Sequence, residues 1–431
     1  MDSRGILRTI VNVPRRRAFM SMAKLRTMRP TRTSVRAGKL LAAATYLLFL
    51  CAVSWHLYKN PLYRMDALQY AANALLIQKS DIVQIHRQIY DDVNKSIPQP
   101  SRDYLQGRQP GAPADQNRSR EMRSKHPHLL GEFLPLFAIR PLYIQVIYLM
   151  HAAGVGLIRS TILISAISYF LLGALLYFWI QPYCGPLFAI VVSSLLMLSS
   201  PMTTLGSENI SDCLATLVAF TAIYLILEKK LLTPGLTVLL ASIYFRTDFV
   251  MLAAPVLVLC WRKRWLAAWQ TAVLAGVALG SVLLINYFAG DYGMGMLYFR
   301  NFHGVPVAPG EMSVPFSLRE YGSAFRHGVT LVLGSFFIPF LLAGLVAVSR
   351  APRSRALFAV ALPYSALHFL ALPNWEERWF CVFYLSMGVA AGMALERQHW
   401  VVRLNSADGD SDYRHPEEMT LGATASASIA V

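Results

Sequence analysis

Long apolar stretches separated by short polar ones run through most of the chain. Many of them approach the ~20 residues that a helix needs to cross a bilayer. The pattern predicts an all-α polytopic membrane protein with about 10 transmembrane helices. The expected spans are 39–58, 157–180, 185–202, 210–228, 231–246, 249–261, 265–289, 329–349, 355–373 and 379–396.

The segment 63–76, just after the first span, has a two-faced helical pattern. Asp66, Gln69, Tyr70 and Asn73 recur at i, i+3, i+4 and i+7, and leucine and alanine occupy the opposite face. Such a helix lies in the membrane interface with its apolar face in lipid. We therefore expect an interfacial helix that holds the Asp66 carboxylate where lipid meets water.

A second apolar stretch, 133–152, is broken at Arg140-Pro141. The helix that follows Arg140 is only ~18 Å long, against a hydrocarbon core of ~30 Å. Short loops rich in Lys and Arg stay cytoplasmic, and those at 228–230, 261–264 and 350–355 share one side only if 133–152 does not cross. We expect this stretch to be interfacial or re-entrant, both termini to be cytoplasmic, and 231–261 to form a hairpin with its outer tip at 246–248.

This topology divides the chain into five parts. They are a basic cytoplasmic tail (1–38), a transmembrane module (39–289) whose outer loop 59–133 carries interfacial helices, an outer loop (290–328), C-terminal transmembrane helices (329–396) and a polar cytoplasmic tail (397–431). The middle of the first outer loop, 96–128, is rich in Pro, Gln, Arg and Gly and is predicted to be flexible or disordered.

Composition supports a membrane protein. Hydrophobic residues make up 55% of the chain and charged residues 15%, against about 25% charged in soluble domains. Eleven Lys and Arg lie in the first 39 residues, which favours a juxtamembrane tail near anionic lipid. A nucleic-acid partner is the weaker alternative, because no aromatic or folded unit accompanies these charges. The five cysteines lack metal-ligand spacing.

Ionisable residues gather at the predicted outer ends of the spans. At such depth they cost free energy unless they are paired or wet, so they are candidates for function. They are Asp66, Arg140, Glu208, Asp212, Asp248, Arg246, Asp291, His303, Glu376, Glu377 and Arg378. The two arginines next to apolar helices, Arg140 and Arg378, are candidates for binding an anionic ligand.

Structural explanations compete with these functional ones. Asp66 is either a helix N-cap or a catalytic or acceptor-binding carboxylate. Glu208 and Asp212 lie four residues apart at a span start, where the helix dipole also favours acids; Glu208 is the better active-site candidate. Arg246 and Asp248 form either a local ion pair or part of a phosphate site.

Four landmarks together resemble the polytopic GT-C glycosyltransferase superfamily, in the branch of protein mannosyltransferases, aminoarabinose transferases and rhizobial lipopolysaccharide glycosyltransferases. In chain order they are Arg64-Met65-Asp66-Ala67-Leu68-Gln69-Tyr70-Ala71, Ile139-Arg140-Pro141-Leu142-Tyr143, Ser199-Ser200-Pro201 through Glu208-Asn209-Ile210-Ser211-Asp212, and Phe245-Arg246-Thr247-Asp248. The likeness covers roughly 40–260. It departs from the family at Ala67, where a second acid is usual, and in the long interval from Asp66 to Arg140.

The resemblance implies a transferase that moves a sugar from a polyprenyl-phosphate-linked donor to a glycan, lipid or protein acceptor, on the periplasmic face of a bacterial inner membrane. Asp66 first and Glu208 second would be catalytic bases. Tyr70, Arg140, Asp212, Arg246, Asp248 and Arg378 would bind substrate, the arginines through phosphate. No cofactor is certain, and a divalent metal lacks the support of an Asp-x-Asp pair among these residues. A transporter or flippase of a lipid-linked sugar is the alternative function, and a structural or assembly subunit a weaker third.

Overall fold

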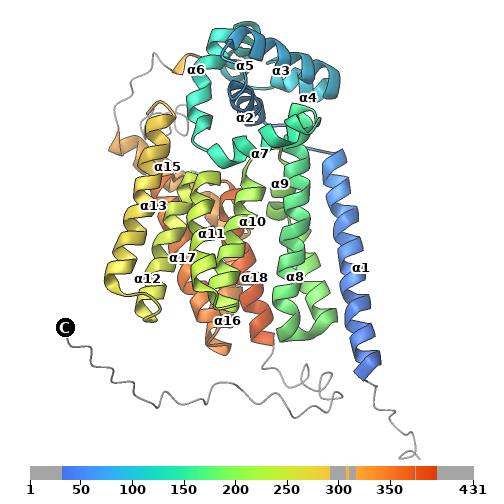
Figure 1. The fold of residues 1–431 in the computed structure, drawn as a ribbon, viewed down its shortest axis with the longest axis vertical. Helices are drawn as coiled ribbons and strands as arrows, with labels where there is room; N and C mark the ends of the chain where they lie inside the picture. The colour runs from blue at the N-terminus through green and yellow to red at the C-terminus, as the bar shows by residue number, and fades with distance from the viewer. Residues whose placement is uncertain (1–31, 292–306, 310–316, 374, 396–431) are drawn as a thin grey trace, which may run out of the picture.

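The computed structural model describes residues 32–291, 307–309, 317–373 and 375–395. Within these ranges the chain forms helices and no strand, apart from an isolated β-bridge between Leu62 and Glu208. Figure 1 shows two parts, a bundle of long helices and a layer of shorter helices across one end of it. The prediction of an all-α protein is confirmed.

The bundle contains fourteen of the described helical segments. They are α1 (Arg32–Lys59), α8 (Leu157–Met197), α9 (Ser200–Ser207), α10 (Asp212–Ile223), η1 (Tyr224–Glu228), α11 (Leu232–Phe245), η2 (Thr247–Phe249), α12 (Val250–Arg262), α13 (Ala268–Phe288), α15 (Leu318–Leu333), α16 (Phe337–Arg350), α17 (Ser354–Ala371), η4 (Glu377–Phe380) and α18 (Cys381–Leu395). The predicted hairpin is present, with the turn η2 between α11 and α12 at the expected tip.

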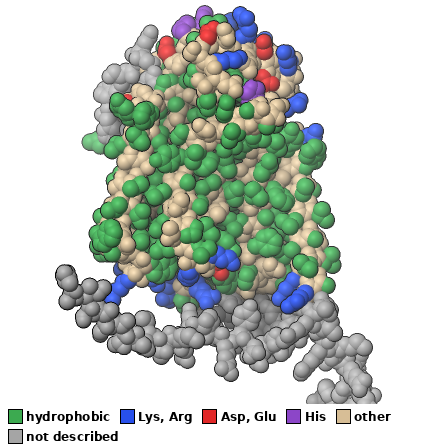
Figure 2. All heavy atoms as spheres, viewed as in Figure 1, with side chains coloured by type: hydrophobic (Ala, Val, Ile, Leu, Met, Phe, Trp, Pro, Cys, Tyr) green, Lys and Arg blue, Asp and Glu red, His purple; other side chains and the backbone are tan. Residues whose placement is uncertain are grey.

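Five described segments are long and apolar enough to cross a membrane, and the number is seven if each of two bent helix pairs is one span. The five are Arg36–Lys59, Leu157–Met197, Ala268–Phe288, Ser354–Ala371 and Glu377–Leu395. Figure 2 shows a broad band of hydrophobic side chains around the bundle, with Lys and Arg at its lower edge. These features fit an integral membrane protein, while the predicted number of ten spans is not confirmed by them.

Helix α8 is two antiparallel segments rather than one rod. Gly185 has φ 78° and ψ 167° in its middle, a conformation that glycine adopts without steric cost. Tyr169 donates from Oη to the carbonyl oxygen of Met197 at 2.5 Å, although a straight helix would separate these residues by ~40 Å. The chain therefore reverses at Gly185, close to the predicted boundary between the second and third spans.

The layer across one end of the bundle consists of six helices, hereafter the α2–α7 layer. They are α2 (Met65–Leu76), α3 (Ile82–Ser96), α4 (Gln99–Leu105), α5 (Ala114–Lys125), α6 (Pro127–Ala138) and α7 (Pro141–Ala152). The layer packs around a second hydrophobic cluster, which also includes residues from the start of α8. One of its contacts with the bundle is at Asp92, whose Oδ2 accepts a hydrogen bond of 3.0 Å from the first turn of α8 at Ile158 N.

The prediction that 96–128 is flexible or disordered is wrong, because this segment contains the helices α4 and α5. Arg120 and Arg123 are buried there, with their guanidinium carbons 4.1 Å and 4.4 Å from the ring centroids of Tyr104 and Phe133. A guanidinium over an aromatic face is attracted to it and shields it from water. Composition counts arginine as polar and so missed the buried area that orders the segment.

The expectation for α2 also needs correction. The helix is amphipathic, but both of its faces are buried, and Gln69, Tyr70 and Asn73 are at most 7% exposed. Neighbouring helices cover the polar face, and Asn73 Nδ2 donates to Leu134 O of α6 at 3.0 Å. Helix α2 is therefore the centre of a folded layer and does not lie free on a lipid surface.

Helices α6 and α7 meet at an angle of 117°. Arg140 lies at the bend and Pro141 occupies the first turn of α7, a position where the missing N–H of proline costs nothing. The Arg140-Pro141 step predicted a break in 133–152, and the structure has that break. The bend places the Arg140 side chain between the α2–α7 layer and the bundle.

Candidate functional site

Charged side chains from seven positions converge where the α2–α7 layer meets the bundle. We call this cluster the arginine–carboxylate junction; its members are Arg64, Arg140, Glu208, Asp212, Arg246, Asp248 and Arg378. Every member lies at or next to a helix end, where the chain turns. Six of the eight site residues predicted from the sequence belong to it, and the other two, Asp66 and Tyr70, come from α2 beside it.

Glu208 is fully buried at the end of α9 and bridges two arginines. Its Oε1 accepts from Arg64, with Nε at 2.8 Å and Nη2 also in contact. Its Oε2 accepts from Arg378 Nη1 at 2.7 Å. The residues before α2 and those at the end of α9 are also joined by two hydrogen bonds. They run from Leu62 N to Ser207 O (2.9 Å) and from Arg64 N to Asn209 Oδ1 (2.8 Å). Both oxygens of Glu208 are therefore occupied by guanidinium groups.

Asp212 is the centre of the junction. It begins α10 and is 1% exposed. Its Oδ1 lies 3.3 Å from Arg246 Nη1 and 3.8 Å from Arg140 Nη1, and its Oδ2 lies 3.5 Å from Arg378 Nε. A buried carboxylate is costly unless it is paired, and three cations surround this one.

The pair predicted at the hairpin tip is present. Asp248 Oδ1 accepts from Arg246 Nε at 2.8 Å, and Asp248 Oδ2 accepts from His368 Nε2 of α17 at 2.8 Å. Burial alone would raise the pKa of Asp248, but the charge of Arg246 and the His368 contact outweigh it and hold that pKa below its ordinary value. Arg246 is only 4% exposed and lies between two carboxylates, so its charge is matched inside the protein.

Arg140 differs from the other arginines of the junction. Its Nη1 donates to Tyr70 Oη and, at 2.7 Å, to Ser211 Oγ, both of them neutral hydroxyls. Burial lowers the pKa of Arg140, and Asp212 offsets this only in part. At Arg64 the carboxylate of Glu208 outweighs burial and raises the pKa. Arg140 is thus the arginine of the junction whose pKa burial lowers on balance, and its side chain is 20% exposed.

Asp66 lies beside the junction and interacts electrostatically with its arginines. It is half-buried in the first turn of α2, and its charge acts on both Arg140 and Arg378. The N-cap of α2 is Arg64, not Asp66. The alternative in which Asp66 merely caps the helix is therefore wrong.

The remaining outer candidates have other positions. Glu376 Oε2 lies 2.5 Å from Arg378 Nη2, so it extends the junction, whereas Glu377 Oε1 accepts from Phe336 N at 3.1 Å. Asp291 is exposed beyond the end of α13. His303 lies outside the described residues.

Two residues, Arg64 of the junction and His368 beside it, have no role in the sequence analysis. Arg64 was noted only as a neighbour of Asp66, although it contacts the buried Glu208. His368 is fully buried in an apolar helix, and an ionisable residue inside an apolar span is itself a signal of function.

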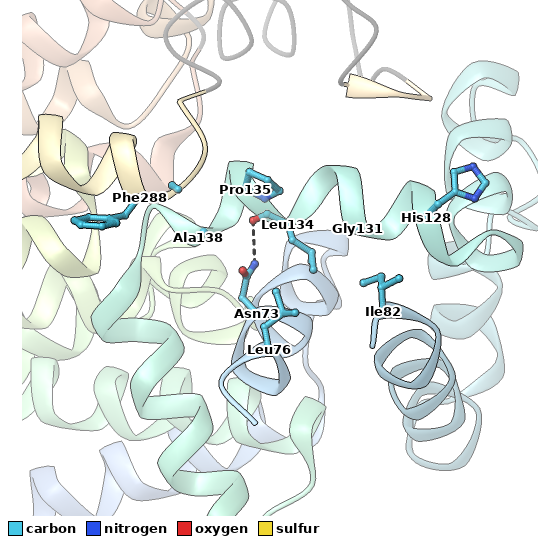
Figure 3. Close-up of a pocket in the computed structure, with 10 residues that line it drawn as sticks. Asn73, Leu76, Ile82, His128, Gly131, Leu134, Pro135, Ala138 and Phe288 are labelled. Atoms are coloured by element: carbon cyan, nitrogen blue, oxygen red, sulfur yellow. Dashed lines mark hydrogen bonds between the residues drawn. The ribbon is translucent and has the colours of Figure 1, made fainter. Parts of the chain in front are cut away.

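A groove of about 460 Å³ lies elsewhere, where α6 meets α2, the start of α3 and the end of α13. Figure 3 shows Leu134, Pro135 and Ala138 of α6 on one side, Leu76 and Ile82 facing them, and Phe288 and His128 towards the two ends. Its lining is mainly apolar and includes no member of the junction. The groove is a separate feature from the charged site.

Among the described residues, no group of three or more His, Cys, Asp or Glu side chains could hold a metal ion. Comparisons of the chain with protein-family models, with curated proteins and with solved structures gave no match. The likeness to GT-C glycosyltransferases therefore stays a prediction from sequence motifs.

Proposed function

We propose that this chain is a membrane glycosyltransferase that moves a sugar from a polyprenyl-phosphate-linked donor to a glycan, lipid or protein acceptor. The observation that supports it best is Arg140, a partly exposed guanidinium whose hydrogen bonds inside the protein go to neutral hydroxyls. A phosphate at Arg140 would add a charge-assisted hydrogen bond to a guanidinium that is 3.8 Å from its partner Asp212, and arginine binds phosphate in a planar, two-point manner.

In this proposal Asp66 is the general base. It takes the proton of the acceptor hydroxyl as that oxygen attacks the anomeric carbon, and the bond from that carbon to the donor phosphate breaks. The departing phosphate keeps the bonding electrons, and Arg140 stabilises its charge. Glu208 is the weaker candidate for the base, because Arg64 and Arg378 occupy both of its oxygens.

The other predicted binding residues serve mainly to hold Arg140 in place. Asp212 lies 3.8 Å from Arg140, and Arg246 and Arg378 balance its charge from two sides. Asp248 balances Arg246 in turn. Tyr70 Oη orients the Arg140 guanidinium directly. The junction is a preorganised support, which is what stabilisation of a developing charge requires.

The test is transfer from a labelled polyprenyl-phosphate sugar by the full-length protein in detergent or vesicles. Asp66→Asn should abolish transfer, and Arg140→Gln should reduce it by at least about 100-fold, the loss seen when one donor to a developing charge is removed. The matched control is Arg326→Gln, an exposed arginine of α15 that should change nothing. Undiminished transfer by folded Asp66→Asn would exclude it as the base.

The same assay separates the enzyme from the alternative of a transporter or flippase. A wild-type protein that moves the intact lipid-linked sugar across vesicles, yet transfers no sugar, would overturn the proposed function. The junction favours the enzyme because its charges gather at one end of the bundle rather than near the middle.

We further propose ten crossings in a bacterial inner membrane, with the junction on the periplasmic side. The reversal of α8 at Gly185 and the turn η2 between α11 and α12 each supply a point where a hairpin returns to the same face. The basic loops after η1, α12 and α16 lie at the end of the bundle away from the α2–α7 layer, as Lys and Arg at the lower edge in Figure 2 indicate.

Sidedness can be measured with a membrane-impermeant thiol reagent on spheroplasts. The exposed Cys51 is first replaced by Ser to remove background, since Cys184, Cys213, Cys260 and Cys381 are buried. Leu62→Cys should react in intact spheroplasts. Lys263→Cys should react only after permeabilisation, and both positions are exposed in the structure. Labelling of both from the same side would contradict the topology.

A further inference from the structure

His368 has a single polar contact with a side chain of the junction. It is fully buried in α17, and its Nε2 lies 2.8 Å from Asp248 Oδ2. Its Nδ1 has no hydrogen-bond partner among the described residues. The rings of Trp379 and Phe380 lie 5.3 Å and 5.6 Å from the imidazole. An imidazole held in an aromatic pocket with one nitrogen directed at a carboxylate is suited to orienting that carboxylate.

A continuous line of charged contacts runs from Asp248 to Arg140. Asp248 Oδ1 holds Arg246 Nε at 2.8 Å, Arg246 Nη1 lies 3.3 Å from Asp212 Oδ1, and the same oxygen lies 3.8 Å from Arg140 Nη1. Asp248 can use one oxygen on Arg246 because His368 occupies the other. Arg246 therefore presents its Nη1 to Asp212 and competes with Arg140 for that carboxylate.

We infer that His368 is a positioning residue that keeps Arg140 available for an anionic ligand. It donates Nε2–H to Asp248 Oδ2 and so prevents Asp248 from turning both oxygens onto Arg246. Without this hydrogen bond Arg246 would move towards Asp248, and Asp212 would be freed to neutralise Arg140. The inference rests on the proposed phosphate-binding role of Arg140, and His368 itself touches neither substrate nor reacting atoms.

Two amides of similar size provide the test. In His368→Gln the amide nitrogen falls near the position of Nε2 and can donate to Asp248, whereas in His368→Asn it falls near Nδ1 and cannot reach. Both variants lose the ring, so they share the packing defect. Ser365→Ala, one turn earlier in α17, is the control, since its buried Oγ donates to the backbone of its own helix at Ala361 O.

The full-length variants are compared in detergent micelles by their affinity for farnesyl phosphate and by their unfolding midpoints. We expect His368→Asn to weaken farnesyl phosphate binding by about tenfold, the effect of losing one hydrogen bond to a charged group. His368→Gln should bind within about twofold of wild type, because it restores that bond. Ser365→Ala should bind as wild type does.

Equal affinities for the Gln and Asn variants would overturn the inference, whether both are normal or both weakened. A lower unfolding midpoint for His368→Asn with unchanged affinity would also overturn it, because a purely structural role predicts that result. A wild-type protein that binds no farnesyl phosphate would instead remove the proposed function. In that case the unfolding midpoints alone test whether His368 donates a hydrogen bond to Asp248. Equal midpoints for His368→Gln and His368→Asn would refute this hydrogen bond.

Discussion

The two ends of the bundle each hold a carboxylate in a different way. At the junction, Glu208 and Asp212 are buried among arginines, with N–O distances of at most 3.8 Å. At the far end, Glu228 closes η1 and its Oε2 accepts from two neutral donors, Tyr183 Oη at 2.6 Å and Trp179 Nε1 at 3.2 Å. Asp212, at the start of α10, and Glu228, at the end of η1, are ~24 Å apart along the helix axis.

Glu228 is an example of a structural carboxylate, whereas the carboxylates of the junction are arranged in a way that suits ligand binding. Glu228 needs no cation, because it is only half-buried and two neutral donors suffice to hold it between helices. The junction instead gathers four arginines around its carboxylates, although burying ion pairs adds little stability compared with apolar packing. In our proposal, binding of an anion at Arg140 is the purpose that this arrangement serves.

The largest effect should come from breaking the junction. Arg378→Met removes the cation that both Glu208 and Asp212 contact. Leaving buried carboxylates without a partner costs about 3–5 kcal/mol, and we expect a loss of unfolding free energy at the lower end of that range because Arg64 and Arg246 remain. Denaturant titration in mixed micelles measures it. A loss below about 1 kcal/mol would mean that these pairs are weak, as exposed ones are.

The matching change at the other end should be smaller. Glu228→Gln keeps an oxygen that Tyr183 and Trp179 can use, so only the charge-assisted part of two hydrogen bonds is lost. We expect a decrease of about 1 kcal/mol in the free energy of unfolding and unchanged sugar transfer. If Glu228→Gln costs as much as Arg378→Met, the contrast between the two ends does not hold.

The smallest effect is a dependence on pH. Because the folded pKa of Asp248 lies below its ordinary value, its ion pair stabilises the protein fully above about pH 4, the ordinary carboxyl range. That contribution is lost as pH falls from there through the folded pKa. Asp248→Asn should therefore have a flatter acid limb than wild type in unfolding midpoints measured from pH 7 downwards. Parallel curves for the two proteins would show that Asp248 gains nothing from Arg246 and His368.

Much of the local structure could be predicted because local rules govern it. The bend at Arg140-Pro141, the hairpin tip at 246–248 and the reversal near Gly185 all follow from proline, glycine and charge at the ends of apolar stretches. The same rules placed Arg140, Glu208, Asp212 and Arg246 at span ends on a common side. Their convergence at a single junction agrees with that sidedness.

The errors concern segments whose structure depends on partners far away in the chain. The composition of residues 96–128 predicted a flexible or disordered segment because arginine is classed as polar. In the structure, however, Arg123 packs on Phe133. Helix α2 read as a surface helix, yet a hydrogen bond from Asn73 to Leu134 O helps to bury its polar face. No pattern within 63–76 indicates which helices will cover it.

The order of polar and apolar residues by itself determined that the chain is helical, where its helices turn, and which ionisable residues lie at their ends. Those features follow from chain length, backbone preferences and the cost of charge in lipid, which act over a few residues. Only the tertiary structure decided which charged side chains pair. Arg64 pairs with Glu208 across 144 residues, and His368 pairs with Asp248 across 120 residues. Pairing of buried charges depends on distances of a few ångströms between separate helices, and it left Arg140 among the junction's arginines with hydroxyls as its hydrogen-bond partners.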